Sequence, residues 1–228
     1  MTISTLESCS DGAVSQPLGE SELRKTGSVS VSGESPCSAV ARRGDYVFDP
    51  DVPIQEARDL VIAYHYSKGT SNTRTDLHGF RRNGVLVAVA WWLPPTRVAC
   101  ESVSKTDWKK VVSLSRLVVR PDEPKNVCSM LIGASIRQIK KEGRWKHLVT
   151  YADHGEGHTG AIYRATNWEY IGTTGPYPKW VDPKGRQTAC KATNNRTKKQ
   201  MEDLGMKMVG RFHKEKFVMH LSKHNNQD

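Results

Sequence analysis

The 228-residue sequence lacks any apolar run that approaches the roughly 20 residues of a membrane-spanning helix. Its N-terminus also lacks the apolar region of a secretory signal peptide. We therefore expect a soluble, cytoplasmic protein without a membrane partner. The hydrophobic fraction of 37% is nevertheless sufficient for a folded core.

Cysteine is scarce and unpaired in this chain. The five cysteines are widely scattered, and none belongs to a Cys-x-x-Cys pair: Cys9, Cys37, Cys100, Cys128 and Cys190. An odd number at such spacing argues against a disulfide framework and against a structural zinc site. We expect free thiols.

The N-terminal part of the chain lacks aromatic residues. Residues 1–44 contain none, but they contain ten serines. Such a segment cannot bury enough apolar surface to offset the entropy lost on ordering. We predict a disordered tail at 1–44 and one folded domain at 45–228.

Acidic residues are absent from one long segment of a chain whose net charge is +10. Residues 1–44 carry five acidic and four basic side chains, so the positive excess lies in the folded part. The densest basic cluster falls between Pro183 and Gln200: Lys184, Arg186, Lys191, Arg196, Lys198 and Lys199. Such a cluster suits the phosphates of DNA, and the alternative is a solvated basic loop.

What the chain does contain is an alternation of strands and helices. The central pattern predicts a strand at 112–119, a helix from Asn126 to 141 stopped by Gly143, a strand at 147–153 and a short helix at 161–165. Before it we expect a helix at 54–66 and a β-hairpin turning at Asn83-Gly84. After it we expect a turn-rich insertion at 172–178, a short polar helix at 197–204 and a closing edge strand at 209–221. This order predicts an α/β sandwich with a mixed sheet.

The central pattern resembles the core of the GCN5-related N-acetyltransferase (GNAT) superfamily. The resemblance is carried by Leu114-Ser-Arg-Leu-Val-Val119, the helix from Asn126, the strand from Leu148 and Ile162-Tyr163-Arg-Ala-Thr-Asn-Trp168. It implies a mixed sheet sandwiched by helices, with the second strand splaying away from the first. It also places Tyr163 where the family has the acid that protonates the leaving group.

A narrower resemblance covers most of the chain beyond residue 44. Four motifs are similar to the Mom family of phage DNA-modification proteins: Ala63-Tyr-His-Tyr-Ser-Lys-Gly69, Leu77-His-Gly-Phe80, Val89-Ala-Trp-Trp-Leu-Pro-Pro95 and Tyr151-Ala-Asp-His-Gly-Glu-Gly157. This resemblance implies double-stranded DNA as the partner and the host cytoplasm as the location. It further implies conversion of the adenine 6-amino group to a carbamoylmethyl derivative that protects phage DNA from restriction nucleases. Access to that amine requires base extrusion or local distortion.

Several side chains are candidates for proton transfer. Asp153 and His154 follow a predicted strand and precede a glycine-rich turn, where open α/β sheets place their sites. Asp153 either handles the adenine amine's proton or caps the following segment. His65 and Tyr66, at the predicted helix end, either transfer protons or complement the helix dipole. Arg116 needs an anionic partner, which is Asp153 or a substrate.

The loop before the main helix departs from the GNAT pattern. Glu123-Pro-Lys-Asn-Val-Cys128 lacks the glycines whose amides would cradle a pyrophosphate. We expect Lys125, Asn126 and Ser129 to hold a two-carbon donor, either acetyl-CoA or a glycine-derived group. The Mom resemblance also suggests iron, for which His65, Asp153 and His154 are the first candidates.

Two other functions remain open from the sequence. One is a conventional acyl-CoA-dependent N-acetyltransferase acting on a protein or small amine, and the other is a DNA-binding protein that shields DNA by occupancy. Trp91, Trp92 and Trp180 are either base-stacking surfaces or core residues. The oligomeric state does not follow from the sequence.

Overall fold

The computed structural model describes residues 40–67, 69, 76–187 and 196–221. Most of the predicted tail and Lys191 of the basic cluster lie outside these residues. Ala41 is buried and exchanges backbone hydrogen bonds with the Asn126 side chain, so the ordered chain begins before Asp45. None of the helices in these described ranges is long and apolar enough to cross a membrane.

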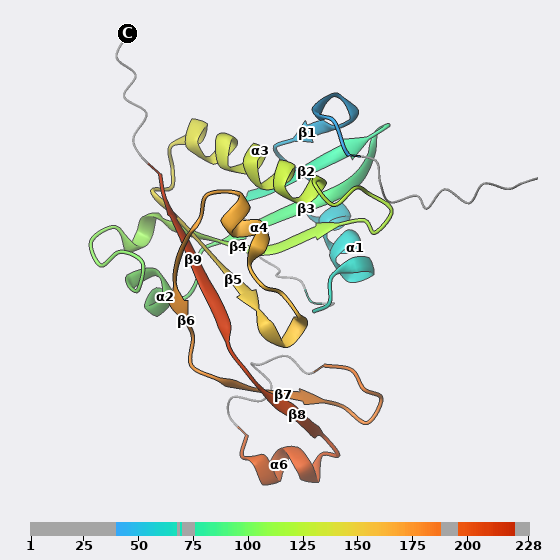
Figure 1. The fold of residues 1–228 in the computed structure, drawn as a ribbon, viewed down its shortest axis with the longest axis vertical. Helices are drawn as coiled ribbons and strands as arrows, with labels where there is room; N and C mark the ends of the chain where they lie inside the picture. The colour runs from blue at the N-terminus through green and yellow to red at the C-terminus, as the bar shows by residue number, and fades with distance from the viewer. Residues whose placement is uncertain (1–39, 68, 70–75, 188–195, 222–228) are drawn as a thin grey trace, which may run out of the picture. The chain divides into compact units, whose positions relative to one another are not determined.

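The core is a seven-stranded mixed sheet in the order β1-β2-β3-β4-β5-β9-β6 (Figure 1). Neighbouring strands run antiparallel except β4 and β5, which run parallel. The strands are β1 (Val47–Asp49), β2 (Asp76–Arg82), β3 (Val85–Leu93), β4 (Val111–Val119), β5 (His147–Asp153), β6 (Glu169–Thr173) and β9 (Lys214–His220). The predicted mixed α/β fold is therefore confirmed.

The predicted hairpin joins β2 and β3. Asn83 and Gly84 both have positive φ, at 52° and 79°. A two-residue turn with two positive φ angles matches the right-handed twist of the strands that it joins. The Asn-Gly pair thus fixes this hairpin locally.

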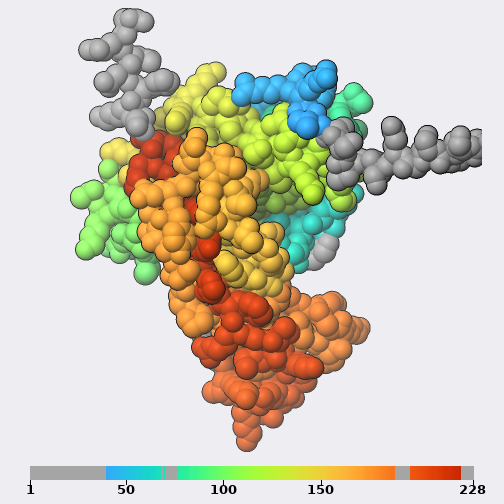
Figure 2. All heavy atoms as spheres, in the orientation of Figure 1, coloured from blue at the N-terminus to red at the C-terminus, as the bar shows by residue number. Residues whose placement is uncertain are grey.

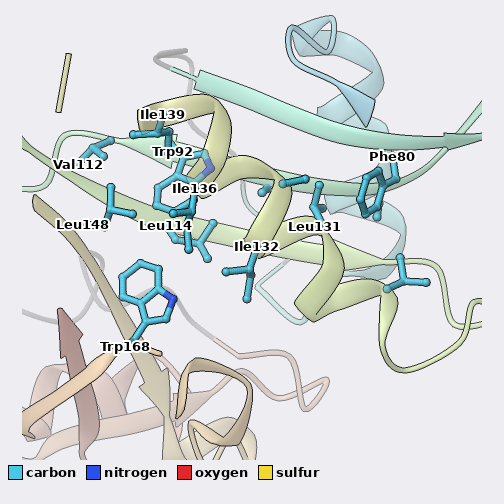
Figure 3. Packing of buried hydrophobic residues seen from close by; sticks show 14 of the residues in the cluster. Phe80, Trp92, Val112, Leu114, Leu131, Ile132, Ile136, Ile139, Leu148 and Trp168 are labelled. Atoms are coloured by element: carbon cyan, nitrogen blue, oxygen red, sulfur yellow. The ribbon is translucent and has the colours of Figure 1, made fainter. Parts of the chain in front are cut away.

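Two helices cover opposite faces of the sheet. α3 (Val127–Glu142) packs on one face and α1 (Ile54–Tyr64) on the other. Trp91 belongs to the α1 cluster and Trp92 to the α3 cluster, because successive side chains of a strand point to opposite faces. Figure 3 shows Trp92 among the α3 side chains. Both tryptophans are almost fully buried, so they are core residues and not base-stacking surfaces.

β4 and β5 separate along their length. Their parallel pairing joins Val111–Ser113 to His147–Val149 and goes no further, although both strands continue. The short elements α2 (Arg97–Glu101) and η2 (Trp108–Lys110) precede β4, and η3 (His154–Glu156) and α4 (Ala161–Ala165) follow β5. The predicted strand at 147–153 and helix at 161–165 are confirmed.

The C-terminal part differs from the prediction. Residues 209–221 were expected to form one edge strand, but they contribute to β8 (Lys207–Phe212) and to β9, which lies between β5 and β6. The predicted turn-rich insertion includes the start of β7 (Tyr177–Val181), which pairs with β8 in a separate two-stranded sheet. The short polar helix is confirmed as α6 (Lys198–Asp203), with Thr197 accepting from the Gln200 amide at its start. α1 also ends earlier than predicted, at Tyr64, with His65 as its C-cap.

Candidate active site

A cavity of about 360 Å³ opens where β4 and β5 diverge. β4 contributes Leu114, Ser115 and Leu117 to its wall, and β5 contributes Tyr151 and Ala152. The remaining wall comes from the end of α1, the first turn of α3 and the segment before and within α4: His65, Tyr66, Cys128, Gly157, His158, Thr159, Gly160, Ala161, Ile162 and Tyr163. Divergence of two parallel strands thus produces a pocket whose wall holds several groups able to transfer protons.

Three aromatic rings meet on one side of the pocket. The Tyr66 ring lies 4.2 Å from His65 and 5.5 Å from His158, measured between ring centroids. The Ser67 amide donates to His65 Nδ1 at 3.1 Å, so a neutral His65 ring carries its proton on Nε2. Partial burial and the negative charge of Asp153 raise the pKa of Tyr66 to about 12. The Tyr66 hydroxyl therefore stays protonated at neutral pH.

Tyr163 is brought into the pocket wall by α4. Gly160, at φ 69°, precedes this helix, and a Cβ there would lie 2.4 Å from Cζ of Phe217. Tyr163 packs on Phe217 and Trp168, with centroid distances of 5.3 and 5.9 Å. Burial raises the pKa of Tyr163, and this effect outweighs a hydrogen bond with Thr150. Tyr163 is thus a protonated phenol in the pocket wall, as its predicted role requires.

Cys128 lies in the first turn of α3 and lines the same pocket. Burial raises the pKa of this thiol to about 11. Since the thiolate is the reactive form of cysteine, Cys128 is a poor nucleophile at neutral pH. Its contribution to the site is shape and polarity.

Asp153 is the last residue of β5 and does not line the pocket. A general base would need to face the substrate in the pocket. The Asp153 carboxylate accepts from the Tyr177 hydroxyl, from the Gly155 amide at 3.0 Å and from Lys214 Nζ at 2.9 Å. Burial favours the neutral acid, but the hydrogen bonds from Tyr177 and Lys214 prevail and lower the pKa of Asp153. These contacts occupy both oxygens in holding neighbouring elements together.

Arg116 does not pair with Asp153. Its guanidinium donates to the carbonyl oxygens of Gly69, at 3.2 Å, and of Ser115, at 2.7 Å. It lies in β4 beside the pocket-lining Ser115, and its positive charge opposes the rise in the pKa of Tyr66. Arg116 is therefore next to the pocket without belonging to its wall.

The predicted donor-binding residues are mostly committed to other contacts. Asn126 does not cap α3 through its side chain, which bonds to Ala41 and the Met130 sulfur, and Ser129 Oγ donates to the Asn126 carbonyl. Lys125 is exposed. These three residues do not form a common binding site in the structure.

The loop before α3 lacks several of the free amides that hold a pyrophosphate in the GNAT pattern. Pro124 has no amide hydrogen, and the amides of Glu123 and Val127 donate within the loop to Arg120 and Pro124. The Glu123 side chain is buried, accepts from the Tyr46 hydroxyl at 2.7 Å and pairs with Arg82 at 2.9 Å. A carboxylate at this position disfavours a second anion nearby.

The predicted iron ligands do not converge. His65 lines the pocket, Asp153 is bound to Lys214, and His154 Nε2 lies 3.3 Å from Glu215 while its ring stacks on His213. Within the described ranges, no group of three or more His, Cys, Asp or Glu side chains is placed to hold a metal ion. The structure does not support the expected iron site.

The described members of the basic cluster are exposed around β7, β8 and α6. Arg186 pairs with Asp182 at 2.7 Å, and Lys198 with Glu202 at 3.6 Å. Acidic residues that flank the cluster in sequence therefore neutralise part of it. Trp180 is buried and, like Trp91 and Trp92, is no stacking surface.

Sequence reasoning missed several residues of this region. His158 stands in a glycine-rich turn that was recognised, so its histidine was a usable signal. Cys128 was visible one residue past the first position of a predicted helix. Tyr177 and Lys214, which bind Asp153, lie 24 and 61 positions further along the chain, and no local pattern marks them.

The parallel strands that splay apart, the helix α3 that follows the first of them and the pocket between them define an α/β fold of the GNAT type. A model of the Mom protein family matches residues 48–224. The chain belongs to the Mom protein family.

Comparison with solved structures gives distant similarities. The ribosomal-protein-S18-alanine N-acetyltransferase of Escherichia coli is 13% identical, with 80% of this chain and 98% of that chain covered and a TM-score of 0.47. A polyamine N-acetyltransferase of Drosophila melanogaster is 12% identical, covering 78% and 100%, at 0.47. A GNAT family acetyltransferase of Elizabethkingia anophelis with acetyl-CoA bound is 12% identical, covering 78% and 99%, at 0.47. No curated protein matches the sequence.

Proposed function

We propose that this protein is a transferase that attaches a carbamoylmethyl group to the 6-amino nitrogen of adenine in duplex DNA. Membership of the Mom protein family carries this proposal. The pocket supports it, because its volume of about 360 Å³ suits one extruded base together with a small donor group. The chain's net charge of +10 further suits a polyanionic partner.

The pocket residues divide into two roles in this proposal. The rings of His65, Tyr66 and His158 offer faces on which a flipped base can stack. Tyr163, which also lines the pocket, supplies a proton to the departing group. A bond forms between N6 and carbon as the bond from that carbon to its leaving group breaks. The leaving group takes the Tyr163 proton, and the proton lost by the adenine amine restores the Tyr163 phenol.

The donor must supply every atom of the carbamoylmethyl group that is transferred. A carbamoylmethyl group contains an amide nitrogen that an acetyl group does not bring, whereas an amide derived from glycine contains that nitrogen and can release its amino group from the CH2 carbon as N6 bonds to it. The loop at Glu123 and Pro124 gives a second reason to favour a donor other than acetyl-CoA, because two of its amides are engaged within the loop and Pro124 has no amide hydrogen. We therefore assign the donor to the glycine-derived class.

Mass analysis of nucleosides tests the proposal. DNA from cells that express the protein should contain a nucleoside heavier than deoxyadenosine by a carbamoylmethyl group in place of hydrogen. DNA from cells that express Tyr163→Phe at the same level serves as the matched control. Finding unmodified deoxyadenosine alone in the wild-type sample would refute the assignment. Release of CoA thiol with a small amine would favour an N-acetyltransferase instead.

A further inference from the structure

Thr150 lies at the point where β4 and β5 separate. Pairing of the two strands ends at Ser113 and Val149, and Thr150 is the next residue of β5. There the Thr150 hydroxyl donates to the carbonyl oxygen of Leu114 at 3.3 Å. Thr150 is buried, with 1% of its surface exposed. A side-chain hydroxyl thus satisfies a backbone carbonyl at the start of the gap between the strands.

The Thr150 side chain also contacts Tyr163. Thr150 is the cross-strand partner of Phe217 in β9, so these two side chains lie side by side on one face of the sheet. The Tyr163 ring packs on Phe217, with 5.3 Å between ring centroids, and Tyr163 forms a hydrogen bond with Thr150. Figure 2 shows the orange atoms of the α4 region against the red atoms of β9. Thr150 therefore contacts both the β4 backbone and a phenol in the pocket wall.

The chemistry of a hydroxyl allows both contacts of Thr150. A threonine hydroxyl has one proton to donate and two lone pairs that accept. While Tyr163 is protonated, its O–H donates to Thr150 Oγ1, and the Thr150 proton goes to the Leu114 carbonyl. After Tyr163 has lost its proton, rotation of the Thr150 hydroxyl directs this donor to the phenolate oxygen. Thr150 bonds to Tyr163 in both states and keeps its own proton throughout.

From this geometry we propose that Thr150 is a positioning residue, which holds the Tyr163 phenol in the pocket wall and stabilises the phenolate formed when the proton leaves. The inference rests on the proposed function, in which Tyr163 protonates the departing group. The O–H bond of Tyr163 breaks as its proton moves to that group, and the proton lost by the adenine amine restores the phenol. Because Thr150 does not line the pocket, it acts through Tyr163.

The phenolate of Tyr163 needs a donor because it forms away from bulk water. Burial raises the pKa of Tyr163, whereas the hydrogen bond with Thr150 lowers it. A hydrogen bond to a charged oxygen is stronger than one to a neutral oxygen. Thr150 therefore stabilises the phenolate more than the phenol. An interaction that strengthens as the proton leaves accelerates the step.

Thr150→Val keeps the shape of the side chain but removes its hydroxyl. We expect adenine modification, measured by mass analysis of nucleosides, to fall about tenfold, the scale of one hydrogen bond to a charged group. Thr150→Ser retains a hydroxyl at this position and should modify DNA nearly as well as the wild type. A loss in Thr150→Ser as large as that in Thr150→Val would contradict a role of the hydroxyl.

Thr166→Val is the matched control for Thr150→Val. The Thr166 hydroxyl donates to the carbonyl oxygens of Ile162 and Tyr163, at 2.8 and 3.3 Å, and not to the phenol. The substitution thus removes the same group and its bonds to the backbone from the helix that carries Tyr163. Modification should stay at the wild-type level. Equal losses in Thr150→Val and Thr166→Val would overturn the inference.

A titration at position 163 tests the contact without any reaction. In the full-length protein, 3-fluorotyrosine in place of Tyr163 gives a fluorine NMR signal and a more acidic phenol. With Thr150→Val this signal should titrate at higher pH, because the phenolate has lost a donor. With Thr150→Ser or Thr166→Val it should titrate as in the protein with threonine at both positions. An unchanged titration in Thr150→Val, at an unchanged melting temperature, would overturn the inference.

A second substitution covers a Thr150→Val protein that fails to fold. Thr150→Cys keeps a weak S–H donor of similar size, so the signal should move in the same direction by a smaller amount. No movement in a folded Thr150→Cys protein would likewise overturn the inference.

The outcomes remain distinct from those of the proposed function. If the wild type modifies adenine but Thr150→Val leaves the titration unchanged, the inference fails and the function stands. If the titration moves but the wild type forms no modified nucleoside, the function fails and the contact between Thr150 and the phenol stands. If the titration moves while Thr150→Val modifies adenine normally, the contact plays no part in the reaction and the inference fails.

Discussion

At the scale of single residues, the proposed reaction uses the Tyr163 hydroxyl, which lies in the pocket wall, as the proton source for the departing group. Tyr163→Phe keeps the ring contacts with Phe217 and Trp168 but removes the acid. We expect adenine modification to fall about a hundredfold, the usual scale for a positioned acid. Nucleoside analysis measures this loss, and DNA affinity should stay at the wild-type value.

Thr166→Ser is a suitable control for Tyr163→Phe, because Thr166 lies at the end of the same helix and outside the pocket wall. It should modify DNA normally. A Tyr163→Phe protein that retains near-normal modification would show that the tyrosine is structural, and His65 or Tyr66 would then be the next acid to test.

The raised pKa of the Cys128 thiol predicts slow alkylation of the folded protein and a loss of stability at high pH. Its pKa rises from an ordinary 9.0 to about 11, so at pH 8 the folded protein should hold about a hundredfold less thiolate than the unfolded chain. Alkylation of the Cys128 peptide by iodoacetamide, followed by mass spectrometry, should be slower in buffer than in urea by that order. The native state keeps a proton that the unfolded state releases above pH 9, so this group lowers stability as the pH rises from 9 to 11. Equal alkylation rates at pH 8 would contradict the burial.

Residue types in the sequence predicted part of this chemistry. Tyr163 and His65 do line one pocket, which the family resemblance and helix positions anticipated. For Asp153, the position after a strand left a catalytic carboxylate and a cap of the following segment open, and the structure confirms the cap, since Asp153 accepts from the Gly155 amide at the start of η3. Its partners Tyr177 and Lys214 come from distant elements, and tertiary contacts alone determine what a buried carboxylate does.

At the scale of elements, the loop before α3 is held by a buried carboxylate where the GNAT pattern has glycines. Glu123→Gln retains an acceptor for Tyr46 but removes the negative charge beside Arg82. Because Arg82 is 40% exposed, solvent screens the pair, and we expect a loss of about 1–2 kcal/mol in the free energy of unfolding. Urea denaturation measures it.

Asp122→Asn supplies the matched control for Glu123→Gln. Asp122 is the neighbouring position and pairs with Arg120 at 3.2 Å on the surface. Its removal should leave the urea midpoint unchanged. Equal midpoints for all three proteins would show that Glu123 does not anchor this loop.

Elements whose conformation is determined by residues close together in the sequence were predictable. The Asn83-Gly84 turn and the α3 helix ending at Gly143, with its φ of 66°, need few distant partners. The position of β9 within the sheet was not predictable, because alternation of side chains in a strand is the same at an edge and in the interior. Its neighbour β6 begins at Glu169 and ends inside the segment 172–178, whose glycines and prolines indicated turns.

At the scale of the whole molecule, a DNA-modifying enzyme and a DNA-shielding protein differ in what remains on the DNA after the protein is removed. A shielding protein protects DNA while it is bound, whereas a covalent modification survives removal of the protein. We expect DNA from expressing cells to resist restriction enzymes that recognise adenine-containing sites after protease treatment and phenol extraction. DNA from Tyr163→Phe cells should be cut normally, because loss of the acid leaves little modified adenine. Complete cutting of the wild-type DNA after extraction would leave occupancy as the mechanism of any protection seen in cells.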